Sequence, residues 1–315
     1  MCAGESMAML VPDTPGELTP ETHYRITVAG AESNVASYLS MLGASSAWVS
    51  RVGADPFGEY ILRELRQRNV NVSSTRIDPD RPTGVAYKDR TENQTRVNYF
   101  RAGSAASAMD VDMVQAVHAF APALLHLSGV TSALSDSCKR FMEEAIRARN
   151  PRTLISYDVN WRPVLWKGAD HSEVLASAKA CDIVFVGLDE ADALWNVNTP
   201  RAARKLLPEP QTLVVKQGAE GATIFHHDEE SFVSALKVDV IEPVGAGDAF
   251  AAGFLAGLLS DMPFSRAARL GTVTASSALS VASDIGTLPP REYVEELLHV
   301  DDAEWCNRRF TARQG

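Results

Sequence analysis

The sequence predicts an α/β fold in which helices cover both faces of a doubly wound, mostly parallel central sheet, with a small β-sheet lid beside it. Short apolar runs that suit strands buried on both faces, such as residues 183–186, alternate with helical patterns along most of the chain. Residues 73–104 break this alternation and show the period of two that is typical of an antiparallel hairpin. No linker or internal repeat interrupts the 315 residues. We therefore expect a single domain over 1–315, with a lid formed by about 7–28 and 73–104.

The elements can be placed in chain order. Gly4 would end a first strand of very few residues, and an Asp-Pro pair before residue 57 opens a helix with an N-cap and a first-turn proline. Strands are expected at residues 46–51, 124–128, 153–158, 182–186, 213–216 and 238–241, and helices at 57–68, 135–149 and 249–259. In the lid, strands at 83–88 and 95–101 flank the turn-forming residues 89–93. Parallel strands joined by helices take right-handed crossovers.

The composition argues against several classes of protein. The net charge of −10 argues against nucleic acid or an anionic membrane as the main partner. The four cysteines are far apart and form no Cys-x-x-Cys pair, which is typical of thiols in a reducing compartment. No apolar run is long enough to span a bilayer, and no signal-peptide pattern opens the chain. We therefore expect a cytoplasmic protein.

The most informative segment is residues 244–250, where two glycines one position apart precede a carboxylate, Asp248. A glycine turn that opens a helix presents free backbone N–H groups at the positive end of the helix, which is a common phosphate site. A carboxylate beside bound phosphate suits the removal of a proton from an attacking hydroxyl. The alternative is structural, because Gly-x-Gly is frequent in turns and Asp suits the first turn of any helix. Residues far from this segment must decide between the two.

A second glycine followed by a helix lies at residues 30–36, with Asn34 four positions after the glycine. Alone this pattern is a helix start, but together with 244–250 it resembles the PfkB (ribokinase-like) family of sugar kinases. Residues 50–58 also resemble that family's Gly-x-Asp-x-x-Gly segment, and the resemblance runs from Gly4 to about Pro290. The resemblance implies a ribokinase-like fold and phosphoryl transfer from ATP with Mg²⁺.

Three further segments resemble the members of this family that phosphorylate 2-keto-3-deoxygluconate: residues 99–107, 127–131 and 158–166. That resemblance implies that Arg101 from the lid and Arg162 from the body hold a substrate carboxylate through paired hydrogen bonds. It also implies that four other residues contact the sugar: Gly30, Asn34, Tyr87 and Tyr99. The alternative for either arginine alone is a surface ion pair.

The implied mechanism centres on Asp248, which orients and deprotonates the terminal hydroxyl of the sugar for attack on the γ-phosphorus of ATP. The N–H groups of Gly245, Ala246 and Gly247 would form an anion hole that stabilises charge on the transferring phosphoryl oxygens. For the nucleotide, the resemblance implies binding by Lys216, Gly218, Gly221 and Gly247. The alternative for that glycine pair is a plain hairpin turn.

Two departures from the family pattern concern metal ions. The family's Asn-x-x-Glu is Gly-Leu-Asp-Glu here, so Glu190 remains to organise Mg²⁺ through water while the Asn is missing. Ahead of the glycine turn, Pro243 and Val244 offer no side-chain oxygen for the monovalent cation that some relatives bind. A K⁺ site is therefore not predicted.

We expect an ATP-dependent sugar-acid kinase that acts on the terminal hydroxyl of 2-keto-3-deoxygluconate. The alternatives are another kinase of the family, acting on 5-dehydro-2-deoxygluconate, fructose or ribose, and a catalytically silent sugar-binding sensor. A nicotinamide dehydrogenase would need Gly-x-Gly-x-x-Gly after an early strand, which the sequence lacks. The expected partners are the sugar acid and ATP, and a homodimer through the lid is expected by resemblance.

Overall fold

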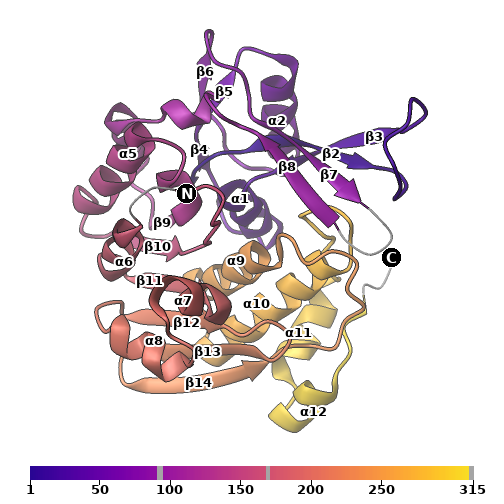
Figure 1. The fold of residues 1–315 in the computed structure, drawn as a ribbon. Helices are drawn as coiled ribbons and strands as arrows, with labels where there is room; N and C mark the ends of the chain where they lie inside the picture. The colour runs from indigo at the N-terminus through magenta and orange to yellow at the C-terminus, as the bar shows by residue number, and fades with distance from the viewer. Residues whose placement is uncertain (91–94, 168–170, 312–315) are drawn as a thin grey trace.

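The computed structural model describes residues 1–90, 95–167 and 171–311, and its centre is an eight-stranded sheet in the order β14-β13-β12-β11-β10-β9-β1-β4 (Figure 1). The strands of this sheet are β1 (Cys2–Ala3), β4 (Trp48–Val49), β9 (Leu124–Ser128), β10 (Leu154–Asp158), β11 (Ile183–Gly187), β12 (Thr212–Lys216), β13 (Gly221–His226) and β14 (Glu229–Ser234). The strands from β4 to β12 are parallel, whereas β12, β13 and β14 form an antiparallel edge. The predicted mostly parallel sheet is therefore confirmed.

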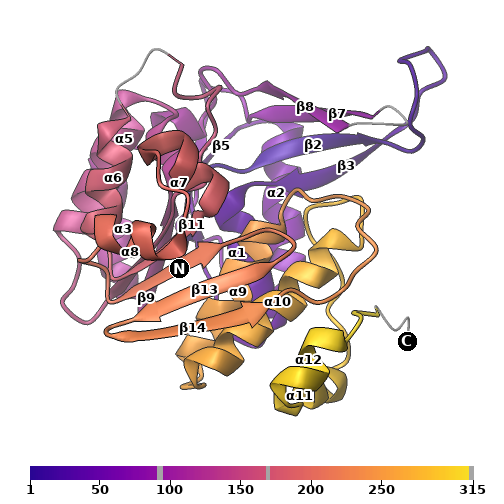
Figure 2. The ribbon, with the colours of Figure 1, turned by 60° about the horizontal axis from the view of Figure 1, so that its bottom comes forward.

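The sheet separates two apolar cores, because successive residues of a strand point to opposite faces. On β11, Phe185 joins one core while Val184 and Val186 join the other. One face is covered by α1 (Ala31–Met41), α2 (Pro56–Gln67), α9 (Ala246–Leu259), α10 (Phe264–Leu279), α11 (Arg291–His299) and α12 (Asp302–Asn307). The other is covered by α3 (Val114–Phe120), α5 (Asp136–Arg147), α6 (Ser172–Lys179), α7 (Leu188–Trp195) and α8 (Pro200–Leu206), with the single turn α4 (Gly129–Ser132) after β9. Figure 2 shows the sheet between these two helical layers.

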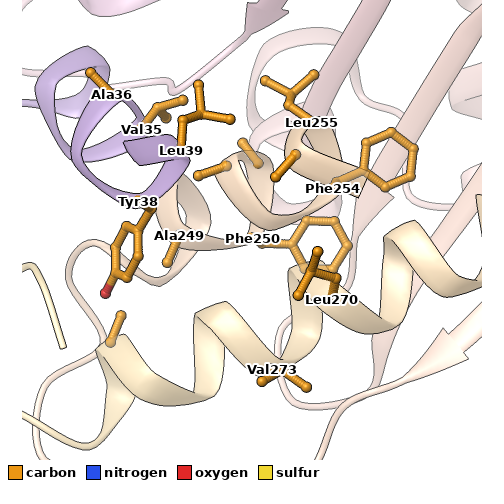
Figure 3. Close-up of a cluster of buried hydrophobic side chains, with 14 of the residues drawn as sticks. Val35, Ala36, Tyr38, Leu39, Ala249, Phe250, Phe254, Leu255, Leu270 and Val273 are labelled. Carbon is orange, nitrogen blue, oxygen red and sulfur yellow. The ribbon is translucent and has the colours of Figure 1, made fainter. Parts of the chain in front are cut away.

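Helix α9 is buried over most of its length, which fixes the position of its first turn. Its apolar side chains pack between those of α1 and α10 (Figure 3). The labelled contacts include Phe250 and Leu255 of α9, Leu39 of α1, and Leu270 of α10. At Gly253, an added Cβ would lie 2.6 Å from the Leu270 carbonyl oxygen, so α9 and α10 approach backbone to backbone. The first turn of α9 therefore rests on a closely packed support.

A second, four-stranded sheet stands above α1 and α9 in Figure 1, in the order β3-β2-β7-β8. Its strands are β2 (Met7–Pro12), β3 (Tyr24–Ala29), β7 (Val85–Arg90) and β8 (Thr95–Phe100). The expected hairpin is β7 paired antiparallel with β8, and part of its expected turn at 89–93 lies outside the described residues. The inner face of this lid carries Met7, Met9 and Ala86 in a small apolar cluster.

Two expected strands differ from the structure. The strand expected at 46–51 divides at Ser50 into β4, which pairs with β1, and β5 (Arg51–Gly53), which pairs with β6 (Arg76–Asp78). The strand expected at 238–241 is wrong, because that segment is a loop with Val240 57% and Ile241 56% exposed. Its backbone is held by the end of α10 instead, where the Ile241 N–H donates to the Leu279 carbonyl at 2.8 Å.

Among the described residues, no helix combines the length and the apolar character that crossing a membrane requires.

Candidate active site

The polar residues of the candidate site gather where the parallel strands end and the lid overhangs the body. Ser128 ends β9, Asp158 ends β10, and Lys216 ends β12. Because the strands are parallel, these carboxyl ends share one edge of the sheet. The first turn of α9 meets the same edge and contributes Asp248, which lines a cavity with Asn34 and Asn160. We call this space between the lid and the body the lid cavity.

Asp248 is the central acid of the lid cavity. Its Oδ2 accepts a hydrogen bond from Asn34 Nδ2 at 2.9 Å, and its Oδ1 accepts one from Asn160 Nδ2 at 3.3 Å. The residue is 9% exposed. Burial raises the pKa of the Asp248 carboxyl to about 7, and the Asn34 hydrogen bond only partly opposes that rise. A carboxyl with such a pKa can accept a proton and release it near neutral pH, as a general base must.

The glycine turn before Asp248 has the conformation that the sequence predicts. Gly245 is the N-cap of α9 with φ of 87°, and an added Cβ would lie 2.6 Å from the Asp284 carbonyl oxygen. Both the left-handed φ and the close approach require glycine at this position. The helix begins at Ala246, whose N–H donates to the Pro243 carbonyl at 3.4 Å, and the N–H groups of its first turn have no acceptor within the helix. They form a group of donors at the positive end of the α9 dipole.

Two amide oxygens in the lid cavity lack a partner within the described structure. They are Asn34 Oδ1 and Asn160 Oδ1, both buried. A buried polar atom without a partner costs free energy of roughly 1–3 kcal/mol, so such atoms are normally satisfied by a ligand or by water. Both oxygens belong to residues that also hold Asp248, which places hydroxyl-accepting groups beside the base.

Arg101 lines the lid cavity, but its charge is already partly balanced. Its guanidinium forms an ion pair with Glu5, whose side chain is 0% exposed, and its Nε donates to Glu5 Oε2 at 2.6 Å. Ser104 Oγ donates to the other oxygen of the same carboxylate. Tyr99 lines the cavity too, and the Arg101 guanidinium lies 5.7 Å from its ring centre. A guanidinium has five N–H donors, so Arg101 keeps donors for a ligand.

Arg162 lines the lid cavity from the body, on the loop that follows β10. Its Nη1 donates to the Trp161 carbonyl at 3.2 Å, and its charge lowers the pKa of Asp248. The neighbouring Trp161 ring stacks on Trp166 with 5.6 Å between ring centres, which supports this loop. Arg162 is exposed to solvent, unlike Arg101.

The structure does not bring Tyr87 to the lid cavity. Tyr87 lies opposite Asn98 in the β7–β8 ladder, whereas Tyr99 lies opposite Ala86. Adjacent residues of a strand point to opposite faces, so Tyr87 and Tyr99 point to opposite faces of the lid. The Tyr87 ring stacks on Phe100 instead, with ring centres 6.1 Å apart. Gly30, by contrast, lines the cavity as the N-cap of α1, where an added Cβ would lie 2.3 Å from the Glu5 carbonyl oxygen.

A larger cavity of about 680 Å³ lies on the other side of the glycine turn, between α10 and the β12–β13 turn. Its lining includes the four residues expected at the nucleotide: Lys216, Gly218, Gly221 and Gly247. Lys216 Nζ donates to the two oxygens of Asp158 at 3.0 and 2.9 Å. Burial alone would lower the pKa of Lys216, but the charges of Asp158 and Glu190 outweigh it and raise that pKa. An added Cβ on Gly247 would lie 3.3 Å from Lys216 Nζ, so this ammonium reaches the start of α9.

Glu190, the expected Mg²⁺ residue, lies in the first turn of α7. Its Oε2 accepts the Gly187 N–H at 2.7 Å, and its Oε1 accepts the Trp161 N–H at 2.8 Å. Among the described residues, no group of three or more His, Cys, Asp or Glu side chains is arranged to hold a metal ion.

Sequence reasoning missed four residues of this site: Glu5, Asp158, Asn160 and Asp284. Asp158 and Asn160 lie in a segment whose family likeness was recognised, yet only Arg162 was assigned a role from it. A polar residue directly after an apolar strand is the signal that could have identified Asp158. Glu5 and Asp284 carry no local signal, because their partners are distant in the sequence.

Comparison with known proteins agrees with this geometry. The model of the pfkB family of carbohydrate kinases matches residues 1–291. The chain is 35% identical over 308 residues to 2-dehydro-3-deoxygluconokinase from Thermoproteus tenax, covering 94% of this chain and 92% of the relative. It is 33% identical over 305 residues to the Bacillus subtilis (strain 168) protein of the same name, covering 94% of each. A probable chloroplastic fructokinase-6 from Arabidopsis thaliana is 31% identical over 319 residues, covering 95% of this chain and 82% of the relative.

Solved structures agree as well. A PfkB protein from Polaromonas sp. JS666 is 30% identical with a TM-score of 0.81, covering 93% of this chain and 98% of that one. A putative ribokinase II from E. coli, solved in complex with ATP and Mg²⁺, is 20% identical with a TM-score of 0.83, covering 94% and 97%. The ribokinase-like form of the fold is therefore confirmed.

Proposed function

Because the chain belongs to the pfkB family of carbohydrate kinases, we propose that it phosphorylates the terminal hydroxyl of a sugar acid, 2-keto-3-deoxygluconate (2-dehydro-3-deoxygluconate), with ATP. One observation carries the choice of an acid: Asp248, Arg101 and Arg162 line the same cavity. A base and two guanidinium groups in one space suit a substrate that has a hydroxyl at one end and a carboxylate at the other. The names of the relatives from Thermoproteus tenax and Bacillus subtilis support the same choice.

Asp248 is the general base of this proposal. The Asn34 and Asn160 amides fix its two oxygens, so that the carboxylate can take the proton of the substrate hydroxyl without turning away. The free amide oxygens of the same two asparagines would accept neighbouring sugar hydroxyls and orient the acceptor. Correct placement of the attacking hydroxyl is a large part of catalysis in phosphoryl transfer, where the transition state is loose.

The proposed nucleotide site is the 680 Å³ cavity next to the glycine turn. Its volume lies within the usual range of roughly 300–1,000 Å³ for small-molecule sites, and the lining supplies the Lys216 ammonium and the first-turn N–H groups of α9. ATP supplies the phosphoryl group when bound, and its Mg²⁺ would neutralise part of the negative charge of the phosphates. Because Mg²⁺ keeps several waters and binds through few protein carboxylates, a water-mediated role of Glu190 fits this chain.

The two guanidinium groups of the lid cavity suit a substrate carboxylate better than a neutral sugar. Arg101 and Arg162 bring two positive charges, and buried Glu5 balances one of them. Arg162 is thus the main net attraction for a carboxylate, and Arg101 adds directed N–H donors. The predicted role of Tyr99 is kept in this proposal, and that of Tyr87 is not. The homodimer through the lid stays a prediction.

The test is coupled ADP release with Mg-ATP against a small set of acceptors: 2-keto-3-deoxygluconate, 2-keto-3-deoxygalactonate, 5-dehydro-2-deoxygluconate, gluconate, fructose and ribose. We expect the highest kcat/KM on a keto-deoxy acid. The variant Arg25→Ala, which removes an exposed lid arginine paired with Asp13, is the control for Arg162→Ala. Turnover on fructose or ribose alone would contradict a sugar acid as the substrate, but not the phosphorylation of a sugar hydroxyl.

A further inference from the structure

Lys88 on β7 is a charged side chain that the lid contributes to the interior of the body. Its side chain is 0% exposed, and it is among the largest fully buried side chains in the described chain. Nζ lies 3.2 Å from Asp284 Oδ1 and 3.5 Å from Glu242 Oε2, and it donates to the Ala282 carbonyl at 3.1 Å. Burial of a lysine is rare without such partners, because desolvation of the ammonium is costly.

The ligands of this ammonium are all oxygens, two from carboxylates and one from the backbone. Glu242 and Asp284 are themselves nearly buried, with side chains 4% and 7% exposed. Burial raises the pKa of the Asp284 carboxyl, and the Lys88 charge opposes that rise. Lys88 Nζ lies near both buried carboxylates and balances their charge; without it, they would need another cation or a shared proton. A monovalent metal ion would be held by the same kind of oxygens, and here the space is filled by Lys88 Nζ.

Both carboxylate residues also touch the glycine turn. Glu242 Oε1 accepts the Val244 N–H at 3.4 Å. The backbone of Asp284 lies against Gly245, where an added Cβ would come within 2.6 Å of the Asp284 carbonyl oxygen. Glu242 and Asp284 therefore lie between the Lys88 ammonium and the glycine turn that carries the N–H donors at the start of α9. The ammonium links these donors to β7, a strand of the lid.

We propose that Lys88 is a positioning residue whose ammonium serves as a built-in monovalent cation, holding the glycine turn in its phosphate-binding conformation and tying that turn to β7 of the lid. The residues therefore do not fit an added K⁺ ion, in agreement with the lack of side-chain oxygens on Pro243 and Val244. The proposal rests on phosphoryl transfer at this turn and not on which sugar is the acceptor.

The experiment replaces the ammonium and offers a substitute from solution. Turnover of wild type and of Lys88→Ala is measured with Mg-ATP and any acceptor from the set above, in chloride salts of K⁺, NH₄⁺ or choline at one ionic strength. We expect wild-type kcat to be the same in all three salts. We expect Lys88→Ala to lose on the order of 100-fold in kcat in choline, as small displacements of catalytic groups do. K⁺ or NH₄⁺ should restore a large part of that loss, and KM for the acceptor should change less than kcat.

A second measurement needs no acceptor, so failure of the proposed substrate and failure of this inference can be told apart. The apparent unfolding temperature of Lys88→Ala should rise in K⁺ or NH₄⁺ relative to choline, because a cation that binds only the folded protein stabilises it. Wild type and the lid control Arg25→Ala should show no such difference. If Lys88→Ala does not fold in choline, the similarly sized Lys88→Met replaces it, and we expect low kcat without rescue because the space stays filled.

Three outcomes would overturn the proposal. Wild-type turnover that depends on K⁺ would mean that the ammonium does not serve as the cation. If Lys88→Ala in choline chloride had the same kcat as wild type, the glycine turn would not need the ammonium. Equal effects of K⁺, NH₄⁺ and choline on the variant would assign Lys88 a purely structural role.

Discussion

Two carboxylates flank the glycine turn, and their surroundings are opposite. Glu242, before the turn, faces the ammonium of Lys88 at 3.5 Å. Asp248, after it, accepts hydrogen bonds from the neutral amide N–H groups of Asn34 and Asn160. A buried carboxylate with a cation beside it has its charge balanced and serves as a fixed anchor. For a buried carboxylate whose hydrogen-bond donors are neutral, burial raises the pKa; at Asp248 the charges of Arg162 and Lys216 only partly oppose that rise, and the pKa is about 7. The group beside each carboxylate, an ammonium at Glu242 and amides at Asp248, therefore decides which of the two can act as a base.

Removing the reactive carboxylate should give the largest effect. Asp248→Asn keeps the shape but cannot take a proton, so we expect kcat to fall by about 10²–10⁴-fold, with binding of sugar and nucleotide retained. Coupled ADP release and equilibrium binding measure the two quantities. Asp189→Asn, at an exposed position of α7, is the control and should keep wild-type turnover. Near-normal turnover of Asp248→Asn would end the assignment of the base.

Displacing the turn that separates the two carboxylates should come next. Gly245→Ala adds a Cβ 2.6 Å from the Asp284 carbonyl oxygen at a φ of 87°. Gly43 has a similar φ of 89° but no atom within 4 Å of an added Cβ, so Gly43→Ala reports the cost of the backbone conformation alone. We expect Gly245→Ala to lose roughly 100-fold in kcat and Gly43→Ala to lose only stability. Equal kcat in the two variants would show that the close approach to Asp284 is irrelevant to catalysis.

The charge near Asp248 can be changed by substituting Arg162, while Asp248 itself is kept. Arg162→Ala removes the exposed guanidinium of the lid cavity, and we expect kcat/KM for a sugar acid to fall by about 10–100-fold, equivalent to about 1.4–2.8 kcal/mol. Turnover of a neutral family substrate should change little. Arg101→Ala is a poorer test, because it leaves Glu5 buried without its cation. A loss that is equal for acids and neutral sugars would contradict the carboxylate role of Arg162.

The pH dependence of wild-type turnover should report the pKa of Asp248. The base acts when deprotonated, and the pKa of Asp248 is about 7. We therefore expect kcat/KM to rise about tenfold per pH unit below pH 7 and to level off above it. The slope is measured between pH 5.5 and 8.5 in buffers of constant ionic strength. A profile that stays flat down to pH 5 would show that Asp248 is ionised throughout and that its burial is offset in the free enzyme.

The smallest effect should be on the free energy of unfolding, which should fall as the pH rises, whereas kcat/KM should rise. The folded-state pKa of Asp248 lies above its usual value of 3.8, so the folded protein binds the proton more tightly than the unfolded chain does. The stabilisation from this group is full below about pH 4 and is lost as the pH rises through about 7. Asp248→Asn should therefore unfold at a higher temperature than wild type at pH 8, and this gain should shrink at pH 5. A variant that is less stable at pH 8 would contradict the burial cost assigned to the carboxylate.

The sequence predicted the reactive half of this comparison and missed the other half. Asp248 and Asn34 lie in helix-opening motifs, and local geometry brings such motifs to the ends of parallel strands. Lys88 stands in an alternating strand, where a lysine usually indicates a solvent-facing position, and its partners lie far along the chain. The failed strand at 238–241 has a similar cause. Its apolar residues suit a strand, but this segment is held against the end of α10, just before the chain enters the glycine turn.

The stacked pair Trp161 and Trp166 has a practical consequence. Trp161 lies between Asn160 and Arg162 on the loop that lines the lid cavity, and its backbone N–H is held by Glu190. The emission of an indole ring depends on its polar surroundings and on its stacking partner. A ligand that draws in Arg162 would alter both, so the unlabelled protein carries its own optical reporter of acceptor binding. Titrations followed by this signal, without nucleotide, would distinguish acceptors that bind unproductively from those that never enter.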